Sequence, residues 1–168
     1  NKIQSNSISV KNIIKDIRIN GDKALLKYEK KFNKNKTIIP TSYQIFKSIS
    51  SLDKKVKKAI DLAYKRIYKF HSFQKLKNIV YVDKFKNKLE YRYIPIDSVA
   101  IYVPGSTASY PSSVLMNAVP ALVAGVKRIV MINPSYEGNL NPAVLYAASK
   151  CKIKEIYSVG GPSAIAAA

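Results

Sequence analysis

The hydrophobic positions of this chain change their spacing near its middle. From residue 9 to about residue 76, apolar side chains recur every three or four positions, with lysines and other polar residues between them. From residue 98 onward, short runs rich in β-branched residues alternate with longer helical segments. The first spacing is typical of amphipathic helices, and the second of parallel strands joined by crossover helices. The pattern therefore predicts a helical leader followed by a parallel sheet.

The leader divides into several predicted helices. Residues 9–19 and 23–32 each place their apolar side chains on one helical face, and Asn20-Gly21-Asp22 separates them, because glycine accepts a left-handed stop and aspartate caps a following helix. Residues 38–49 are ambiguous, although Thr41 or Ser42 could cap a short helix there. The longest amphipathic segment runs from residue 51 to about residue 76, with Asp53 in its first turn and a basic, solvated face.

Between the leader and the sheet, the spacing becomes strictly alternating. Residues 79–83 and 89–94 alternate apolar and polar side chains around a lysine-rich turn, which predicts a β-hairpin. Tyr91 and Tyr93 share one face of it, where packing is a more economical interpretation than base stacking. Residues 94–97 then link the hairpin to the sheet.

The stretch from residue 98 to residue 134 reads as strand, glycine turn, helix and strand. Pro104-Gly105 ends the strand 98–103, because proline cannot continue the ladder and glycine accepts unusual backbone angles. Pro111 suits the first position of the next helix, whose residues 114–126 are apolar almost all round and are expected to be buried on most sides. Gly125 is expected to end this helix, and residues 128–132 form the second strand.

The same pattern then repeats. Residues 142–150 predict a second crossover helix and residues 155–159 a third strand, followed by the turn Gly160-Gly161-Pro162-Ser163 and the start of another helix. Three strands alternating with helices form a βαβαβ half of a nucleotide-binding-type sheet. Residues 1–96 are expected to form the leader and hairpin, and residues 97–168 the sheet domain. Both glycine turns are expected at one edge of the sheet, where they could face one ligand.

The turn Pro104-Gly105-Ser106-Thr107 is the clearest candidate for binding. Ligands of open parallel sheets bind outside the carboxyl ends of the strands, and this turn offers backbone N–H groups and two hydroxyls near the start of a helix, as a phosphate requires. It is not the sequence G-x-G-x-x-G, and a plain turn is the alternative.

The charge and composition of the chain bear on whether it binds nucleic acid. The net charge is +19, and most of it lies in residues 1–92, which hold 24 basic and 7 acidic side chains. A basic half suggests a nucleic-acid-binding module. However, 25 of the 29 basic residues are lysine, which is better explained by a coding bias, and arginine, the better reader of phosphates and bases, is scarce. Nucleic-acid binding therefore remains the weaker hypothesis.

The numbers of cysteine and histidine residues argue against a disulfide, a catalytic thiol and a zinc site. The single cysteine, Cys151, cannot form an internal disulfide, which suits a reducing cytoplasm, and a buried, inert thiol is expected rather than a nucleophile. The single histidine, His71, is expected to meet solvent or a structural hydrogen bond. One histidine and one cysteine do not make a zinc site, and no run of residues is long and apolar enough to span a membrane or to serve as a signal segment.

Several runs of the chain carry a resemblance to a known family. In the sheet half they are residues 99–105, 110–118, 120–121, 124–126, 159–161 and 164–167. In the leader they are residues 21–25 with Tyr28 and Phe32, and Phe70-His71 with Gln74. With these residues in this order, nearly the whole chain resembles histidinol dehydrogenase.

The resemblance implies an activity and an architecture. Enzymes of this family oxidise L-histidinol to L-histidine through an aldehyde, with NAD as oxidant and a bound zinc, in the last reaction of histidine biosynthesis. They are intertwined cytoplasmic homodimers that are longer than this chain. The expected fold class is therefore α/β: a helical leader with a β-hairpin, then an incomplete Rossmann-like parallel βαβαβ sheet.

The resemblance also implies site residues. Tyr102 matches a tyrosine that contacts NAD, and Pro104, Gly105 and Gly161 belong to the cofactor turns. Ser106 stands where a second glycine is usual, and Ser163 where the family has a glutamine that contacts NAD.

The zinc ligands, the glutamate–histidine acid/base pair and the substrate contacts of the family fall beyond Ala168, so no catalytic or metal residue is assigned. The chain is interpreted as a truncated, N-terminal portion that does not turn over by itself. The alternative is a non-catalytic remnant of the family that folds or self-associates without binding NAD.

Overall fold

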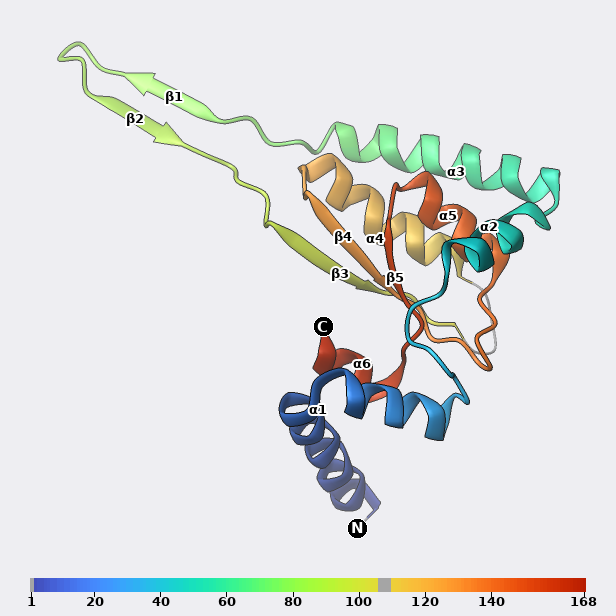
Figure 1. Ribbon diagram of the computed structural model, residues 1–168. Helices are drawn as coiled ribbons and strands as arrows, with labels where there is room; N and C mark the ends of the chain where they lie inside the picture. Colours follow the sequence, from blue (N-terminus) through green and yellow to red (C-terminus); the bar gives the residue numbers. More distant parts are fainter. Residues whose placement is uncertain (1, 106–109) are drawn as a thin grey trace.

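Three parallel strands lie at the centre of the computed structural model, which describes residues 2–105 and 110–168 (Figure 1). They are β3 (Ser98–Tyr102), β4 (Arg128–Ile132) and β5 (Glu155–Tyr157), in the order β3-β4-β5. The helices α4 (Pro111–Ala124) and α5 (Pro142–Lys150) connect them. The predicted parallel βαβαβ sheet and the α/β fold class are confirmed.

One face of this sheet is covered by two layers of helices. Ile101, Met131 and Ile156 point from the three strands into a buried cluster that α4 and α5 close. The helix α3 (Lys54–Ser72) packs over both, and α2 (Ser42–Ser50) packs on α5. As predicted, α4 is buried on most sides, because it packs against the sheet, α3 and α5. One side still faces solvent, where Met116 is 63% exposed.

The other face carries the two ends of the chain (Figure 1). There α1 (Lys2–Phe32) packs against α6 (Gly161–Ala167), and a second apolar cluster joins them to the sheet. Its buried members are Ile17, Ala24, Leu25, Ile132, Val159 and Ala164. The predicted interruption of the leader is confirmed at Gly21, whose φ of 51° and ψ of −133° break α1 into two helical segments.

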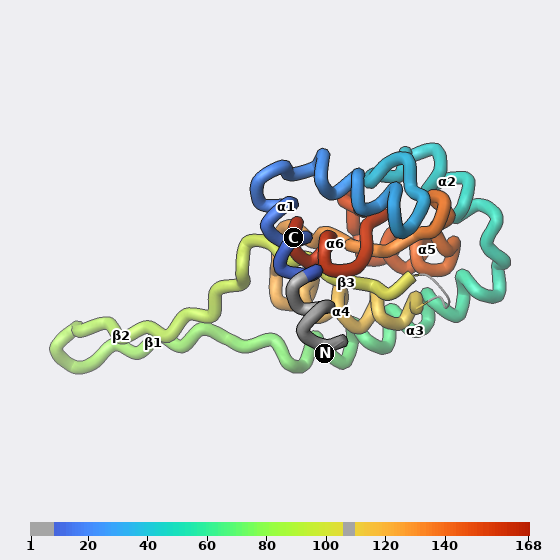
Figure 2. The backbone as a smooth tube through the Cα atoms, turned by 90° about the horizontal axis from the view of Figure 1, so that it is seen from below, coloured from blue at the N-terminus to red at the C-terminus, as the bar shows by residue number. Residues whose placement is uncertain are grey.

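The β-hairpin forms an arm that leaves the body of the molecule (Figure 2). Its strands β1 (Ile79–Val82) and β2 (Lys88–Tyr91) pair antiparallel, with Ile79 opposite Tyr91 and Tyr81 opposite Leu89. Every side chain of the two strands is exposed. The arm is thus the part of the described structure with the least cover.

Capping side chains set several helix boundaries. Thr41 caps α2 in a reciprocal arrangement with Gln44, which resolves the ambiguous segment as a helix. Asp53 accepts the N–H of Lys55 at 2.7 Å, so α3 begins after it and not at residue 51. No helix in the described part of the chain is long and apolar enough to cross a membrane.

Candidate functional site

The carboxyl ends of the three strands meet at one edge of the sheet, and Pro104-Gly105 of the first predicted turn and residues 160–163 of the second lie there. The parallel ladder continues past the strands: the N–H of Val103 bonds the carbonyl of Ile132 at 2.8 Å, and the N–H of Asn133 bonds the carbonyl of Tyr157 at 2.9 Å. The chain segments that leave β3, β4 and β5 are therefore held in register where ligands of open parallel sheets bind.

Gly105 is required at this edge by its close neighbours. A Cβ atom added to Gly105 would collide with the carbonyl oxygen of Pro134 and would lie 2.5 Å from Nδ2 of Asn133. The Asn133 amide is itself fixed, because it donates to the carbonyl of Val103 at 2.9 Å. The first glycine turn thus packs its backbone directly on the loop that follows β4, as a side chain at residue 105 would prevent.

Tyr102 joins the two glycine turns. Its phenol oxygen accepts the backbone N–H of Gly161 at 3.4 Å, and 38% of the residue is exposed. Gly161 is exposed as well and has a φ of 63°, a left-handed conformation that glycine adopts without strain. An aromatic ring from the end of β3 and the glycine turn after β5 therefore meet at the surface, across the middle strand β4.

The other residues predicted to contact the cofactor are placed differently. Pro104 is exposed beside Tyr102, whereas Ser163 is 4% exposed and donates its hydroxyl to the carbonyl of Gly160 at 2.9 Å. The Ser163 side chain thus braces its own turn, and its contact with NAD stays a prediction. Ser106 and Thr107 lie outside the described residues.

Three polar residues that the sequence analysis did not single out lie beneath this edge. Glu29, Asn33 and Asn35 come from the end of α1 and the turn after it. The Glu29 carboxylate accepts the N–H of Gly160 at 2.9 Å, and it also accepts the amides of Asn33 at 2.8 Å and Asn35 at 3.0 Å. One signal could have found Glu29: it follows Leu25 by four positions, so it lies on the buried stripe of its helix.

The two single residues with reactive side chains lie elsewhere. Burial raises the pKa of the Cys151 thiol to about 11, which confirms the expected inert, buried cysteine. Nδ1 of His71 lies 2.6 Å from Oε1 of Gln74, so the expected structural hydrogen bond is present.

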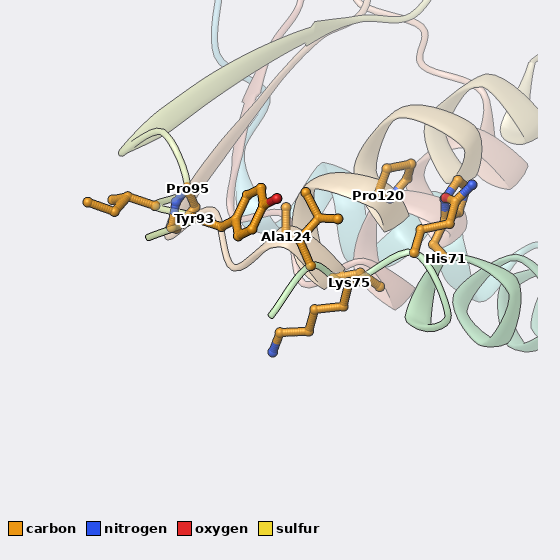
Figure 3. A pocket seen from close by; sticks show the side chains of 10 residues that line it. His71, Lys75, Tyr93, Pro95, Pro120 and Ala124 are labelled. Carbon is orange, nitrogen blue, oxygen red and sulfur yellow. The ribbon is translucent and has the colours of Figure 1, made fainter. Parts of the chain in front are cut away.

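His71 also borders a cavity of about 320 Å³ between the end of α3 and the second half of α4 (Figure 3). Because α4 runs away from the glycine turns, this cavity lies at the other end of the helix from the candidate site. Among the described residues, no three His, Cys, Asp or Glu side chains gather as a metal site would require.

Comparison with known proteins agrees with the resemblance seen in the sequence. A family model described as histidinol dehydrogenase matches residues 1–168. The histidinol dehydrogenase of Pelagibacter ubique (strain HTCC1062) is 76% identical over 167 residues, which cover 99% of this chain and 39% of that protein. The one of Agrobacterium fabrum (strain C58 / ATCC 33970) is 47% identical over 163 residues, which cover 95% of this chain and 38% of that protein.

A solved structure gives the same result in three dimensions. The crystal structure of histidinol dehydrogenase from Elizabethkingia anophelis superposes with a TM-score of 0.89 at 36% identity and covers 96% of this chain but 38% of its own. The chain therefore spans well under half the length of the relatives that it matches. Because the family model extends over all of its residues, the chain belongs to the histidinol dehydrogenase family.

Proposed function

We propose that this chain is the N-terminal, cofactor-binding part of a histidinol dehydrogenase, and that the edge formed by the two glycine turns holds NAD. The reaction would be the oxidation of L-histidinol to L-histidine, in which NAD accepts the hydride. The proposal is carried by one observation: Tyr102 and Gly161 meet at the exposed carboxyl edge of a parallel sheet, where such folds bind nucleotides. The names of the relatives support it.

The residues at this edge fit a dinucleotide. Gly105 lets the backbone approach its neighbours where a side chain would collide, and the exposed Gly161 leaves its backbone open to a ligand. The Tyr102 ring offers an apolar face for a planar group and a hydroxyl for hydrogen bonding. These groups would bind and orient the cofactor; we assign them no proton transfer.

Zinc and a partner subunit belong to the family's expected chemistry, but this chain's described residues do not place them. The described residues of this chain do not gather a zinc ligand set, so we derive no step through the metal. A cytoplasmic homodimer belongs to the proposal, and the free, buried thiol of Cys151 is of the kind found in reducing compartments. By itself the 168-residue chain is expected to bind NAD without reducing it when L-histidinol is added.

Calorimetric titration with NAD at moderate salt tests this proposal. The variant is Tyr102→Ala, and the matched control is Tyr43→Ala, which removes another exposed tyrosine from α2. We expect saturable binding by the wild-type chain and by Tyr43→Ala, and a loss of about tenfold or more in affinity for Tyr102→Ala. No binding at millimolar NAD, or equal affinity in both variants, would contradict the proposal.

A further inference from the structure

Glu29 is a buried acidic residue to which the proposed cofactor chemistry gives no role. It is 1% exposed, and its two oxygens accept three N–H groups: Gly160 on one side, and Asn33 and Asn35 on the other. All three partners are neutral amides. Donors therefore face both oxygens of the carboxylate, and burying such a group is costly unless its hydrogen bonds are all made.

Asn35 extends this arrangement into the loops that follow β4 and β5. Its Nδ2 donates to the carbonyls of Ser135 at 3.2 Å and Ser158 at 3.1 Å. Its Oδ1 accepts the hydroxyl of Ser135 at 3.2 Å and the N–H of Gly138 at 2.8 Å. The end of α1 is thereby fixed to both loops of the candidate edge.

The Gly160-Gly161 turn needs such support because two successive glycines restrain their own backbone weakly. Three contacts hold it from different directions. Glu29 binds the N–H of Gly160, the Ser163 hydroxyl binds the carbonyl of Gly160, and Tyr102 accepts the N–H of Gly161. With the first N–H held inward, the second is left at the exposed edge beside Tyr102.

We propose that Glu29 is a positioning residue for the NAD edge: its carboxylate holds the backbone N–H of Gly160 and so fixes the Gly160-Gly161 turn in the conformation that meets Tyr102. This inference rests on the function proposed above. A turn that is already ordered loses less conformational entropy when a ligand binds, so the bond from Glu29 contributes to NAD affinity without touching NAD.

A carboxylate is required because a glutamine cannot satisfy the same partners. Its single oxygen could accept either the N–H of Gly160 or the amides of Asn33 and Asn35, while its NH₂ group would face a donor on the other side. Changing Asn33 to aspartate would turn one of those donors into an acceptor. The pair Glu29→Gln with Asn33→Asp therefore keeps one carboxylate and restores a complementary contact.

The test compares Glu29→Gln, the double variant Glu29→Gln/Asn33→Asp and the control Asp61→Asn. Asp61 is a carboxylate that also joins two helices, since it accepts the hydroxyl of Tyr146 and pairs with Lys150, but it lies between α3 and α5, away from the edge. NAD affinity is measured by calorimetry, and exchange of the Gly160 amide hydrogen by NMR.

We expect Glu29→Gln to weaken NAD binding about fivefold or more, because a buried donor loses its partner, and to speed exchange at Gly160. The double variant should recover part of the affinity, since the Asn35 amide still faces the new NH₂ group, and Asp61→Asn should bind like the wild type. Wild-type affinity in Glu29→Gln, or no recovery in the double variant, would overturn the inference.

Two further outcomes keep the inference separate from the proposed function and from misfolding. A wild-type chain that binds no NAD removes the proposed function and this inference with it, whereas a binding wild type with an unaffected Glu29→Gln removes the inference alone. If Glu29→Gln does not fold, the wild-type chain still decides: a Gly160 amide that exchanges as fast as an exposed turn amide contradicts the bond to Glu29.

Discussion

The central sheet and the β1–β2 arm are both built from strands, but only the sheet buries its side chains. Met131, in the middle strand, is completely buried between helices and sheet, whereas every side chain of β1 and β2 is exposed. Two-stranded hairpins are marginally stable by themselves. The difference teaches that local pattern determines the strand, while its environment determines what the strand contributes to stability.

The two faces of the arm differ in polarity, as in a hairpin that packs one face on a core. Ile79, Tyr81, Leu89 and Tyr91 share one wholly apolar face, as the register of the two strands requires. The other face carries Glu90, which pairs with Lys88 at 3.3 Å and with Arg92 at 2.7 Å. The arm therefore has the alternation of a half-buried hairpin although the described residues leave both of its faces open.

Two leucines give the largest expected contrast between sheet unit and arm. Leu115, in α4, is 1% exposed and Leu89, in β2, is 60% exposed. Leu115→Ala should lower the free energy of unfolding by about 2–5 kcal/mol through a cavity in the core. Leu89→Ala should change it by less than about 0.5 kcal/mol. Urea unfolding followed by circular dichroism measures both, and similar losses in the two variants would refute the comparison.

A second pair of variants compares a crowded glycine at the carboxyl edge of the sheet with a glycine that has more space. Gly105→Ala should cost about 1–3 kcal/mol of stability, because the new Cβ collides with the loop after β4. Its control is Gly125→Ala at the far end of α4, where an added Cβ would lie an ordinary 3.7 Å from Pro95 but φ is 92°, and it should cost about 1 kcal/mol from backbone strain alone.

NAD titration separates the two glycine variants further. Only Gly105→Ala should weaken binding, since Gly105 belongs to the proposed cofactor turn. An equal loss of NAD affinity in Gly125→Ala would show that general destabilisation, and not the edge itself, controls binding.

The smallest expected effect is a local response of the arm to acid. Hydrogen bonds from the side chain and backbone of Asn87, and from the N–H of Phe85, lower the pKa of Asp83. A lowered pKa in the folded state means that these bonds stabilise the turn fully above the unfolded pKa, near 3.8, and that this contribution is lost as the pH falls through the folded value.

The amide signals of Phe85 and Asn87 should therefore shift and lose protection in NMR spectra below about pH 4, while those of β4 stay protected. Asp83→Asn is the matched variant, because it removes the titrating group from the turn. If its turn responds to acid as the wild type does, another group is responsible.

The sequence predicted those helices and strands whose ends are marked by local residues such as glycine and proline. The predicted helix 142–150 matches the bounds of α5, and Gly125, whose φ is 92°, ends α4 as predicted. The placement of Gly105 and Gly160-Gly161 at one edge also followed from topology, because the carboxyl ends of parallel strands share one edge.

What remained hidden depends on contacts between distant residues. The spacing from Leu25 places Glu29 on the buried stripe of its helix, but the partner that explains it, Gly160, lies 131 positions away. The exposed side of α4 was likewise invisible, since an apolar sequence does not reveal whether another element covers it. The spacing of hydrophobic residues predicts which face of a helix or strand is buried, whereas hydrogen bonds between distant residues are known only from the three-dimensional structure.

The contacts of Asn35 also impose an order on folding. Its side chain bonds the carbonyls of Ser135 and Ser158, which lie 100 and 123 positions later in the chain. While the protein is being synthesised from its amino end, the leader can form its helices early but cannot close this connection until β5 has left the ribosome. Docking of the first helix is consequently a late step in folding.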